Sequence, residues 1–465
     1  MEKNVSSRPF SPAAEARARV AAIRDKLKAG NVVAAVVGGG KSGEAAIDLL
    51  RSKGAEVRLF DDREITVAGL TSSPIEHAAM DAVDVVVLSP GVPRRHPELQ
   101  PAITRNKLVG EVELASWFVR APMVGITGTN GKSTTTALVG KIFEVAGRKV
   151  FAGGNLGEPL SRLAMASEPV DVAVVELSSY QLESIVTASF RVGCWLNVAP
   201  DHTDRYDNLD EYAAAKRRVL DRRTHDGVAV LNAKDPYCSG IGVRTGGPIR
   251  WFAGAEASDL AGPMGTRLSG PSEAVRTDNG VEERYQLTAP WIVGTHNKAN
   301  ACAAIECARA MDVTPADVQA GLDAFGGLPH RLELVRDDDD TRWFNDSKAT
   351  NIESVFTALT ALAGRRVVWI AGGRDKGAPW APLAGLVDDR VDAVLAIGEA
   401  ASIVEAAFGS KVERVETLER AIARARELAG PGVDVLLAPG CASFDQFKDY
   451  AERGDVFRRL VGAIA

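Results

Sequence analysis

The chain has 465 residues and a formal net charge of −6 at pH 7, with no basic block. At roughly 150 residues per domain this length predicts about three domains, and the charge argues against nucleic acid or an anionic membrane as the main partner. Five scattered cysteines without a C-x-x-C pair indicate free thiols in a reducing compartment. Neither a signal peptide nor a long apolar run occurs, so we expect a soluble, cytoplasmic protein without a membrane span.

The first part of the chain has the pattern of a Rossmann-type nucleotide-binding fold. Gly38, Gly40 and Gly43 form G-x-G-x-x-G between a strand and a helix, and an acidic segment, Asp61-Asp62-Arg63, follows about 20 positions later. A third strand ends in Ser89–Gly91, at the sheet edge where ligands of open α/β sheets bind. This pattern predicts a nucleotide pyrophosphate site and leaves a nicotinamide dehydrogenase open. The predicted elements are helices over 12–28 and 44–53 and strands over 31–37, 56–60 and 83–88.

A glycine-rich loop, Gly128–Thr134, lies between a predicted strand over 121–126 and a predicted helix over 135–145. Its backbone N–H groups and the start of the helix favour phosphate binding. Lys132 would reach the outer phosphates of a nucleotide, and the Ser133 hydroxyl would ligate Mg²⁺. Ile126 stands where the standard G-x-x-x-x-G-K-[ST] pattern has its first glycine. The alternative is a loop that only turns the chain.

Two candidate residues follow other strands of the central part. Glu176 comes after a strand over 170–175, and a carboxylate beside a phosphate loop is expected to bind Mg²⁺, with a solvated charge as the alternative. His202 comes after a strand over 192–198, and both a ligand role and a structural role remain open. The turn over 153–157 allows its backbone to approach a ligand.

The last part again alternates strands and helices, which predicts a mostly parallel sheet. The asparagines of 294–300 open a helix and either contact an adenine or cap that helix. The run 337–340 is predicted to be a solvated turn, and 240–290 shows short strand-like runs without recognisable chemistry. The predicted strands cover 366–371, 393–397 and 433–438, and polar motifs cover 343–351, 372–377 and 439–447.

Together these motifs resemble those of the Mur ligase family of peptidoglycan synthesis, over about residues 31–465. The shared motifs, in the family's order, are Gly128–Thr134, Glu176–Ser179, Asp201–His202, Lys216, His296–Asn297 with Asn300, and His330–Arg331. Three more, at 345–351, 372–377 and 441–447, are similar to those of the glutamate-adding member. The D-N-P-R motif of the diaminopimelate-adding member is absent, and the residues before 31 depart from the family's usual start.

The resemblance implies an α/β protein with three domains. The N-terminal extension and a Rossmann-like domain for the UDP-linked substrate cover 1–112, a P-loop ATPase domain covers 113–327, and a Rossmann-like domain for the amino acid covers 328–465. The implied reaction is ATP-dependent addition of D-glutamate to UDP-N-acetylmuramoyl-L-alanine through an acyl phosphate. A Mur-type ligase for another amino acid, such as L-glutamate, is the main alternative. A P-loop switch or motor and a dehydrogenase are the others.

The resemblance also implies cofactors and site residues. ATP and two Mg²⁺ ions are implied, with Lys216 carbamylated by CO₂, and the protein is expected to be a monomer that binds small-molecule substrates, no nucleic acid and no membrane. The implied catalytic residues are Lys132, His202 and Lys216, and the implied metal ligands are Ser133, Glu176, His202 and Lys216. The implied ATP-binding residues are Gly128, Thr129, Asn130, Gly131, Lys132, Ser133, Thr134, Asn297, Asn300, Arg331 and Asp346. The implied residues for the UDP-linked substrate are Gly40, Ser42, Gly43, Asp62, Arg63, Ser89, Gly91 and Asn155. The implied glutamate-binding residues are Lys348, Thr350, Lys376, Ser443, Phe444 and Tyr450.

Overall fold

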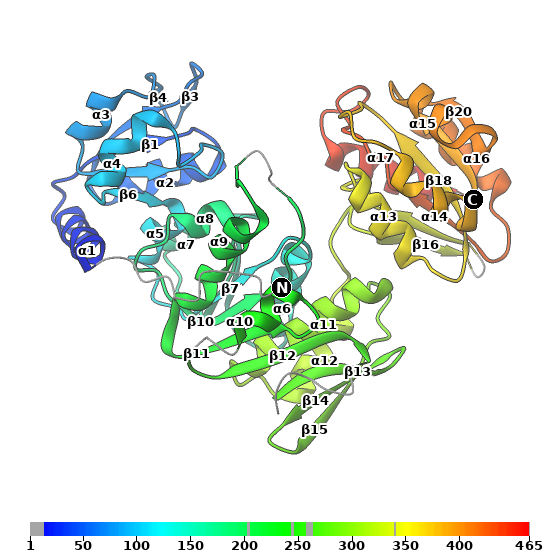
Figure 1. The fold of residues 1–465 in the computed structure, drawn as a ribbon, viewed down its shortest axis with the longest axis horizontal. Helices are drawn as coiled ribbons and strands as arrows, with labels where there is room; N and C mark the ends of the chain where they lie inside the picture. The colour runs from blue at the N-terminus through cyan, green and yellow to red at the C-terminus, as the bar shows by residue number, and fades with distance from the viewer. Residues whose placement is uncertain (1–13, 202–204, 243–245, 257–263, 339–340, 465) are drawn as a thin grey trace. The chain divides into compact units, whose positions relative to one another are not determined.

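The computed structural model describes residues 14–201, 205–242, 246–256, 264–338 and 341–464 (Figure 1). The chain forms two compact units, one of residues 1–286 with 299–324 and one of residues 287–298 with 325–465. In the described residues the first unit holds two large sheets and a short ribbon, and the second unit holds one sheet. Helices and parallel strands alternate in both units, which confirms the predicted α/β class.

The first sheet of unit 1 has four parallel strands in the order β2-β1-β5-β6. Strands covered by helices on both faces are continuous apolar runs, and the valine-rich runs of this part follow that rule. Helix α1 packs against the same core through Val20, Ile23 and Leu27, and Lys26 pairs with Asp84 at 2.9 Å. The elements are α1 (Ala14–Lys28), β1 (Val33–Val37), α2 (Lys41–Ser52), β2 (Glu56–Phe60), β3 (Thr66–Val67), β4 (Leu70–Thr71), α3 (His77–Ala82), β5 (Val85–Leu88), α4 (Gln100–Thr104), β6 (Leu108–Gly110) and α5 (Glu111–Ser116).

The second sheet of unit 1 has nine strands in the order β15-β14-β13-β12-β11-β10-β7-β9-β8. Strands β7 to β11 are parallel, and β13 to β15 form an antiparallel meander at one edge. The strand-like runs predicted in 240–290 are therefore confirmed as strands. The elements are β7 (Met123–Thr127), α6 (Lys132–Val145), β8 (Val150–Gly154), α7 (Leu160–Met165), β9 (Val172–Glu176), α8 (Ser179–Glu183), β10 (Phe190–Trp195), α9 (Leu209–Asp221), β11 (Arg223–Asn232), α10 (Pro236–Gly242), β12 (Ile249–Glu256), β13 (Met264–Gly270), β14 (Glu273–Asp278), β15 (Val281–Gln286), α11 (Gly294–Arg309) and α12 (Pro315–Ala324).

The sheet of unit 2 has six strands in the order β16-β17-β21-β18-β19-β20. All neighbours are parallel except β16 and β17, which form a hairpin. Asp337 and Asp338 belong to a strand of this hairpin and not to a turn, because they pair with Arg342 and Thr341 across it, which corrects the predicted turn. Both are exposed, as the prediction of a solvated segment has it, and residues 339–340 of the predicted run lie outside the described residues. The elements are β16 (Glu333–Asp338), β17 (Thr341–Asn345), α13 (Ile352–Ala361), β18 (Arg366–Gly372), α14 (Ala384–Arg390), β19 (Val391–Ile397), α15 (Ala401–Phe408), β20 (Val412–Glu416), α16 (Leu418–Leu428), β21 (Val433–Leu437) and α17 (Tyr450–Gly462).

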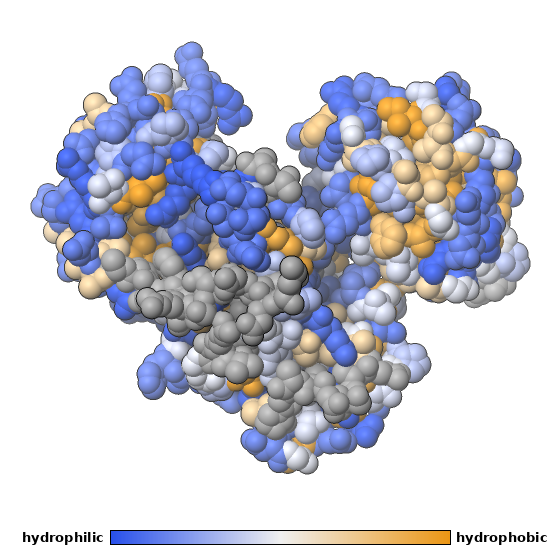
Figure 2. All heavy atoms as spheres, in the orientation of Figure 1, coloured by the Kyte–Doolittle hydropathy of each residue, from blue (hydrophilic) through white to orange (hydrophobic). Residues whose placement is uncertain are grey.

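The surface is largely polar. Hydrophilic residues cover most of the face drawn in Figure 2, and apolar residues lie between them in separate groups. Among the described residues, the exposed large hydrophobic side chains are those of Val281, Phe356, Ile403 and Phe444. No helix in the described part of the chain combines the length and the apolar character needed to cross a membrane.

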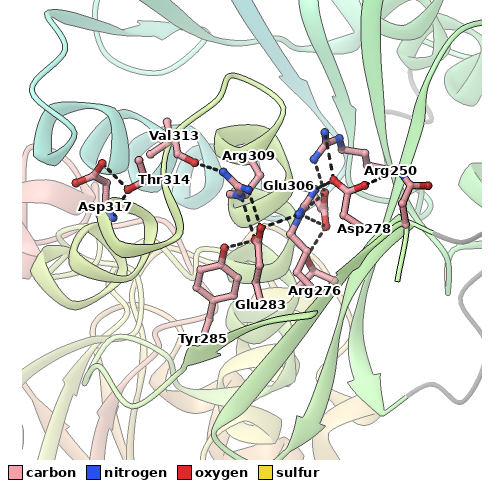
Figure 3. A network of polar contacts seen from close by, with 12 residues as sticks. Arg250, Arg276, Asp278, Glu283, Tyr285, Glu306, Arg309, Val313, Thr314 and Asp317 are labelled. Atoms are coloured by element: carbon pink, nitrogen blue, oxygen red, sulfur yellow. Dashed lines mark hydrogen bonds and ion pairs between the residues drawn. The ribbon is translucent and has the colours of Figure 1, made fainter. Parts of the chain in front are cut away.

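A buried network of charges joins the antiparallel meander to α11 (Figure 3). Glu306 of α11 is fully buried and accepts a hydrogen bond from the Thr266 hydroxyl at 2.5 Å, and the Arg276 guanidinium lies 3.3 Å from its carboxylate. Glu283 pairs with Arg309 at 2.6 Å and with Arg276 at 3.2 Å. The pairing compensates the desolvation of these charges, although burial still raises the pKa of Glu306 above its usual value.

Replacing Glu306 with glutamine is expected to lower the free energy of unfolding by about 3 kcal/mol, because the variant leaves the charge of buried Arg276 incompletely paired. Urea denaturation followed by circular dichroism measures the change. Glu273→Gln is the matched control, since Glu273 pairs at 2.9 Å with the exposed Arg284 of the same meander and should cost less than about 1 kcal/mol. Equal destabilisation by the two variants would contradict a special role for the buried network.

Candidate active site

The predicted phosphate loop lies between β7 and α6, in the strand–loop–helix order that phosphate binding requires. Gly131 precedes α6 with φ +83°, a left-handed conformation that favours glycine. A Cβ atom on Gly131 would also lie only 2.3 Å from the Asn300 Oδ1 atom of α11. Asn300 is buried and accepts a hydrogen bond from the Thr135 hydroxyl at 3.4 Å. The structure thus brings Asn300 against the loop.

Asn197, which the sequence analysis did not single out, holds the loop in shape. Its Oδ1 atom accepts hydrogen bonds from the N–H groups of Thr129 and Asn130 at 3.0 and 2.8 Å, and its Nδ2 atom donates to the Asn130 carbonyl at 3.1 Å. It follows β10, the neighbour of β7 in the sheet. The only sequence signal for this role was its position just after β10, at the edge of the sheet where the phosphate loop also lies.

Lys132 and Lys216 meet at one backbone atom. Both side-chain ammonium groups donate to the Gly128 carbonyl, Lys132 at 2.9 Å and Lys216 at 2.7 Å, and Lys132 also donates to Thr129 at 2.8 Å. Lys216 lies on α9 and is only 1% exposed, with its Nζ atom 4.3 Å from the centre of the Tyr212 ring. Burial, together with repulsion from Lys132, lowers the pKa of Lys216 well below its usual value. A buried amine of this kind loses its proton more easily than an exposed lysine does.

Glu176 ends β9 directly beside the loop, because it pairs with Ile126 of β7 in the parallel register. The carboxylate is 2% exposed, and its Oε1 atom accepts a hydrogen bond from the Asn155 side chain at 2.8 Å. Its buried Oε2 atom has no hydrogen-bond partner among the described residues. A buried carboxylate oxygen left unpaired costs free energy, so this atom fits a cation ligand. The Ser133 hydroxyl, at the first turn of α6, is buried as well.

His202 lies outside the described residues, so the structure does not describe its position or contacts. Within the described part of the chain, no group of three or more His, Cys, Asp or Glu side chains is arranged to hold a metal ion. Of the Mg²⁺ ligands that the resemblance implies, the structure describes Ser133 and Glu176 beside the loop, and Lys216, which donates to the Gly128 carbonyl of the loop.

The glycine loop of the first sheet is tightly packed, as its fingerprint predicts. Gly38 has φ +91°, and a Cβ atom on Gly43 would lie 2.0 Å from the Gly38 carbonyl. The Ser89 hydroxyl donates to that carbonyl at 2.6 Å, which brings the end of β5 against the loop. Asp61 accepts from the Gly39 N–H group at 3.1 Å. Burial acts to raise the pKa of Asp61, but hydrogen bonds from Gly39 and Arg63 outweigh it and lower the pKa.

The other residues implied for the UDP-linked substrate lie around this loop. Asp62 and Arg63 are exposed, and Gly40 and Gly91 are open to solvent at neighbouring strand ends. Lys41, beside Gly40, donates to the Gly157 carbonyl at 2.7 Å and pairs with Glu158 at 3.0 Å. This contact connects the glycine loop with the 153–157 turn that carries Asn155. Ser42 is half-buried in the first turn of α2.

In unit 2 the implied glutamate-binding residues gather at the carboxyl ends of parallel strands. Lys376 donates to the Thr350 hydroxyl at 3.2 Å, and the Lys348 ammonium lies 3.7 Å from the centre of the Tyr450 ring. Ser443 is buried. The Phe444 side chain is 62% exposed, so it makes no part of the core and is free to contact a ligand.

Arg453 connects the polar motif at 345–351 with the motif at 441–447, a role that the sequence did not predict. This residue is 1% exposed and donates to the Ser347 hydroxyl at 3.0 Å, to the Ser347 carbonyl at 2.9 Å and to the Cys441 carbonyl at 3.3 Å. Burial lowers the pKa of Arg453 to about 10, which leaves it charged at neutral pH. It thereby fixes the 345–351 and 441–447 motifs against each other. As one arginine of a charged helix, α17, it carried no sequence signal.

The remaining implied ATP-binding residues lie in unit 2, which includes the first residues of α11 up to Lys298. Asn297 is buried and donates to the Trp291 carbonyl at 3.0 Å. Asp346 accepts from the Leu332 N–H group at 3.1 Å. Burial raises the pKa of Asp346 to about 7, although this hydrogen bond and the charge of Arg331 act in the opposite direction. A carboxyl group with such a pKa changes charge near neutral pH.

Three family models match the chain in order. The model described as Mur ligase MurD-like, N-terminal domain matches residues 32–110, Mur ligase middle domain matches residues 126–308, and Mur ligase, glutamate ligase domain matches residues 330–441. A protein of Anaeromyxobacter dehalogenans named UDP-N-acetylmuramoylalanine--D-glutamate ligase is 48% identical over 448 residues, covering 91% of this chain and 96% of the relative. The chain belongs to the Mur ligase family.

Other Mur ligases agree with this assignment. A Myxococcus xanthus protein that is also named UDP-N-acetylmuramoylalanine--D-glutamate ligase is 44% identical, and the match covers 92% of this chain and 98% of the relative. The MurF ligase of Thermotoga maritima, solved in complex with ADP, has a TM-score of 0.59 at 16% identity, covering 93% of this chain and 95% of its own. MurC of Thermotoga maritima has a TM-score of 0.57 at 17% identity, and the match covers 93% of this chain and 99% of the MurC chain. At such identities the two structures show a shared Mur ligase fold.

The matched Mur ligase domains contain most of the candidate site. The middle-domain match includes the phosphate loop, Glu176, Lys216 and Asn300, and the N-terminal match includes the glycine loop from Gly38. The glutamate ligase domain match ends at 441. Three implied glutamate-binding residues lie beyond the end of this match, namely Ser443, Phe444 and Tyr450.

Proposed function

We propose that this Mur ligase joins D-glutamate to UDP-N-acetylmuramoyl-L-alanine, with hydrolysis of ATP to ADP and phosphate, in the cytoplasmic synthesis of peptidoglycan precursors. The observation that carries the proposal is the 48% identity to a relative named UDP-N-acetylmuramoylalanine--D-glutamate ligase, over 96% of its length. Relatives at 44% and 40% identity have the same name, so addition of another amino acid is not favoured. The enzyme would serve cell wall biogenesis, and through it cell shape and cell division.

The reaction needs an activated carboxylate, because a free carboxylate has no leaving group that an amine can displace. Transfer of the γ-phosphoryl group of ATP to the alanine carboxylate forms an acyl phosphate. The amine of glutamate attacks its carbonyl carbon, phosphate leaves, and the amine loses a proton as the amide forms. Phosphoryl transfer depends mainly on positioning and on neutralisation of charge. The N–H groups of Gly128–Thr134 would position the phosphates, and Lys132 would neutralise charge on the transferred group.

Two Mg²⁺ ions are part of the proposal, and a bound ion would supply further positive charge at the phosphates. The unpaired Oε2 atom of Glu176 and the buried Ser133 hydroxyl fit a first ion, because hard oxygen donors are the ligands that Mg²⁺ prefers. His202 and Lys216 are proposed for the second. Asn297, Asn300, Arg331 and Asp346 would bind the nucleotide.

Lys216 can ligate Mg²⁺ only after its side chain has lost its positive charge. In its observed surroundings the pKa is lowered by burial, which favours the neutral amine. A neutral amine adds CO₂ and releases one proton, and the product is a carbamate anion with two oxygen donors. We therefore propose that Lys216 is carbamylated in the active enzyme. An unmodified Lys216 that binds phosphate is the alternative.

We propose one substrate site in each of three parts of the chain. Residues 1–112 would bind the UDP part, 113–327 the nucleotide, and 328–465 the glutamate, whose two carboxylates need cationic and hydroxyl donors. Lys348 and Lys376 supply the cations, and Thr350 and Ser443 supply the hydroxyl groups. Phe444 and Tyr450 would line the pocket. We further propose that the enzyme acts as a monomer in the cytoplasm and binds neither nucleic acid nor membrane.

Phosphate release from ATP tests the proposal. With UDP-N-acetylmuramoyl-L-alanine and Mg²⁺, addition of D-glutamate is expected to start phosphate release, with one amide product formed per phosphate. L-Glutamate in place of D-glutamate is the control and should give less than about a tenth of that rate, since a site built for one enantiomer leaves buried polar groups unpaired with the other. Equal rates with both enantiomers, or phosphate release independent of any amino acid, would contradict the proposed specificity.

A further inference from the structure

A pocket of about 360 Å³ lies in unit 1, away from the residues assigned to catalysis. Its walls include Pro122 and Met123 at the start of β7, Ser189 and Arg191 at the start of β10, and Thr224 near the start of β11. These strands are parallel, so the pocket is at the amino ends of the strands. The phosphate loop follows the carboxyl end of β7, at the opposite edge of the same sheet.

The sequence shapes this pocket through an irregularity in β11. Phe190 of β10 pairs with Arg223, but Val192, two residues on, pairs with Val228. Three additional residues of β11 therefore leave the ladder between these two pairs, and Thr224 and Asp226 of this segment line the pocket. Such bulges are typical of places where a strand redirects side chains toward a site.

Helix α1 contributes Arg24 to the same pocket. The helix is fixed by the burial of Val20, Ile23 and Leu27, and Arg24 borders this buried face, because it lies one turn after Val20. The Nε atom of Arg24 is buried and makes no hydrogen bond with the described residues, and Asp25 Oδ1 is 4.0 Å from it, beyond hydrogen-bond distance. A buried guanidinium nitrogen without an acceptor is costly. An anion in the pocket would supply that acceptor.

Cations at the pocket exceed the available carboxylates. Three arginines, Arg24, Arg120 and Arg191, line it together with one acid, Asp226. Asp226 already pairs with Arg191 at 2.8 Å and accepts from the Thr224 hydroxyl at 3.0 Å. Arg120 is exposed and makes no hydrogen bond or ion pair with any residue that the structure describes. Arg24 has only the 4.0 Å ion pair with Asp25, which does not line the pocket, so the lining keeps a net positive charge.

Glu113, a buried carboxylate that contacts residues of the pocket lining, does not neutralise the positive charge of the arginines. Glu113 of α5 accepts hydrogen bonds from the N–H groups of Val186, Thr187 and Ala188, at 2.8 to 2.9 Å, and from the Trp117 indole at 2.9 Å. These donors occupy both of its carboxylate oxygens. They also fix the Trp117 ring, which lines the pocket with Val119 and other apolar groups.

We propose that this pocket binds a small organic anion, with its phosphate or carboxylate group on Arg24 and Arg120 and its apolar or aromatic body on Trp117. Guanidinium groups bind both kinds of oxyanion through paired hydrogen bonds. The volume is within the range of small-molecule sites, roughly 300–1,000 Å³. The site is separate from the proposed active site and does not depend on the ligase reaction.

Isothermal titration calorimetry of the full chain with phenyl phosphate tests the proposal, and benzoate tests the carboxylate class. One of the two probes is expected to bind with a stoichiometry of one and a Kd below about 1 mM. Arg24→Ala and Arg120→Ala should each weaken binding about tenfold or more, the loss expected for one charge-assisted hydrogen bond. Arg120→Lys should retain part of the affinity. Circular dichroism verifies that each variant is folded.

Two controls separate this pocket from other cations of the chain. Lys28→Ala removes a positive charge from an exposed position of α1 that does not line the pocket, and should leave binding unchanged. Lys132→Ala removes the phosphate-loop cation and should also leave it unchanged. Binding that is abolished by Lys132→Ala and retained by the two arginine variants would overturn the proposal. Absence of binding by the wild-type chain at 10 mM of either probe, a concentration about ten times the expected Kd, would overturn it as well.

Discussion

Replacement of Lys132 with alanine is expected to lower kcat by about 10²–10³ without loss of the fold. The lysine begins α6, and its Nζ atom donates to the Gly128 and Thr129 carbonyls of the phosphate loop. A cation held there neutralises charge that develops on a transferred phosphoryl group, and this interaction is stronger in the transition state than in the ground state. Steady-state phosphate release at saturating ATP measures the effect.

Lys141→Ala is the matched control for this variant, because Lys141 lies on the same helix and pairs at 3.4 Å with Glu144 at the surface. Its kcat should stay within about a factor of two of the wild-type value, since an exposed ion pair of this kind contributes little. Far-ultraviolet circular dichroism should show the same helix content in both variants. A Lys132→Ala enzyme that retains more than half of the wild-type rate would remove the basis for the phosphate-loop assignment.

The parts of the site that the sequence predicts are those determined by local chain geometry. A glycine such as Gly131 before a helix, and a carboxylate such as Glu176 after an apolar strand, each require only their neighbours in sequence. The pairing of Ile126 with Glu176 then follows from the parallel sheet, which the alternation of strands and helices predicts. The glycine loop at Gly38–Gly43 was recognisable for the same reason.

The parts that the sequence does not predict depend on contacts between distant segments. Asn197 is about 70 residues from the loop that it holds, and Arg453 is about 100 residues from Ser347. Such polar groups are recognised only when the fold shows what they bind. The network around Glu306 was not predicted for the same reason, because the many charged residues of β14 and β15 resemble those of a solvated edge hairpin.

Replacement of Lys216 with alanine is expected to lower kcat by about 10²-fold or more, and a short carboxylic acid such as acetate, or high bicarbonate, should restore part of the activity. The wild-type amine is buried, with its pKa well below the usual value, so it is available to add CO₂. The resulting anion would attract Mg²⁺, whereas an ammonium group would repel it. A small acid can enter the space vacated in the alanine variant and supply the missing oxygen atoms.

Lys107→Ala is the matched control, since Lys107 is also buried in unit 1 but donates to the Asp81 and Val83 carbonyls, at 2.6 and 2.8 Å. Any loss of activity in that variant should not respond to acetate. Lys216→Arg should remain inactive with or without acid, because a guanidinium stays charged and forms no carbamate. Carbon-13 nuclear magnetic resonance of enzyme equilibrated with labelled bicarbonate should show a carbamate signal in the wild type and in Lys107→Ala, but not in Lys216→Ala. A fully active Lys216→Arg enzyme, or a wild type without this signal, would identify Lys216 as a phosphate-binding cation instead.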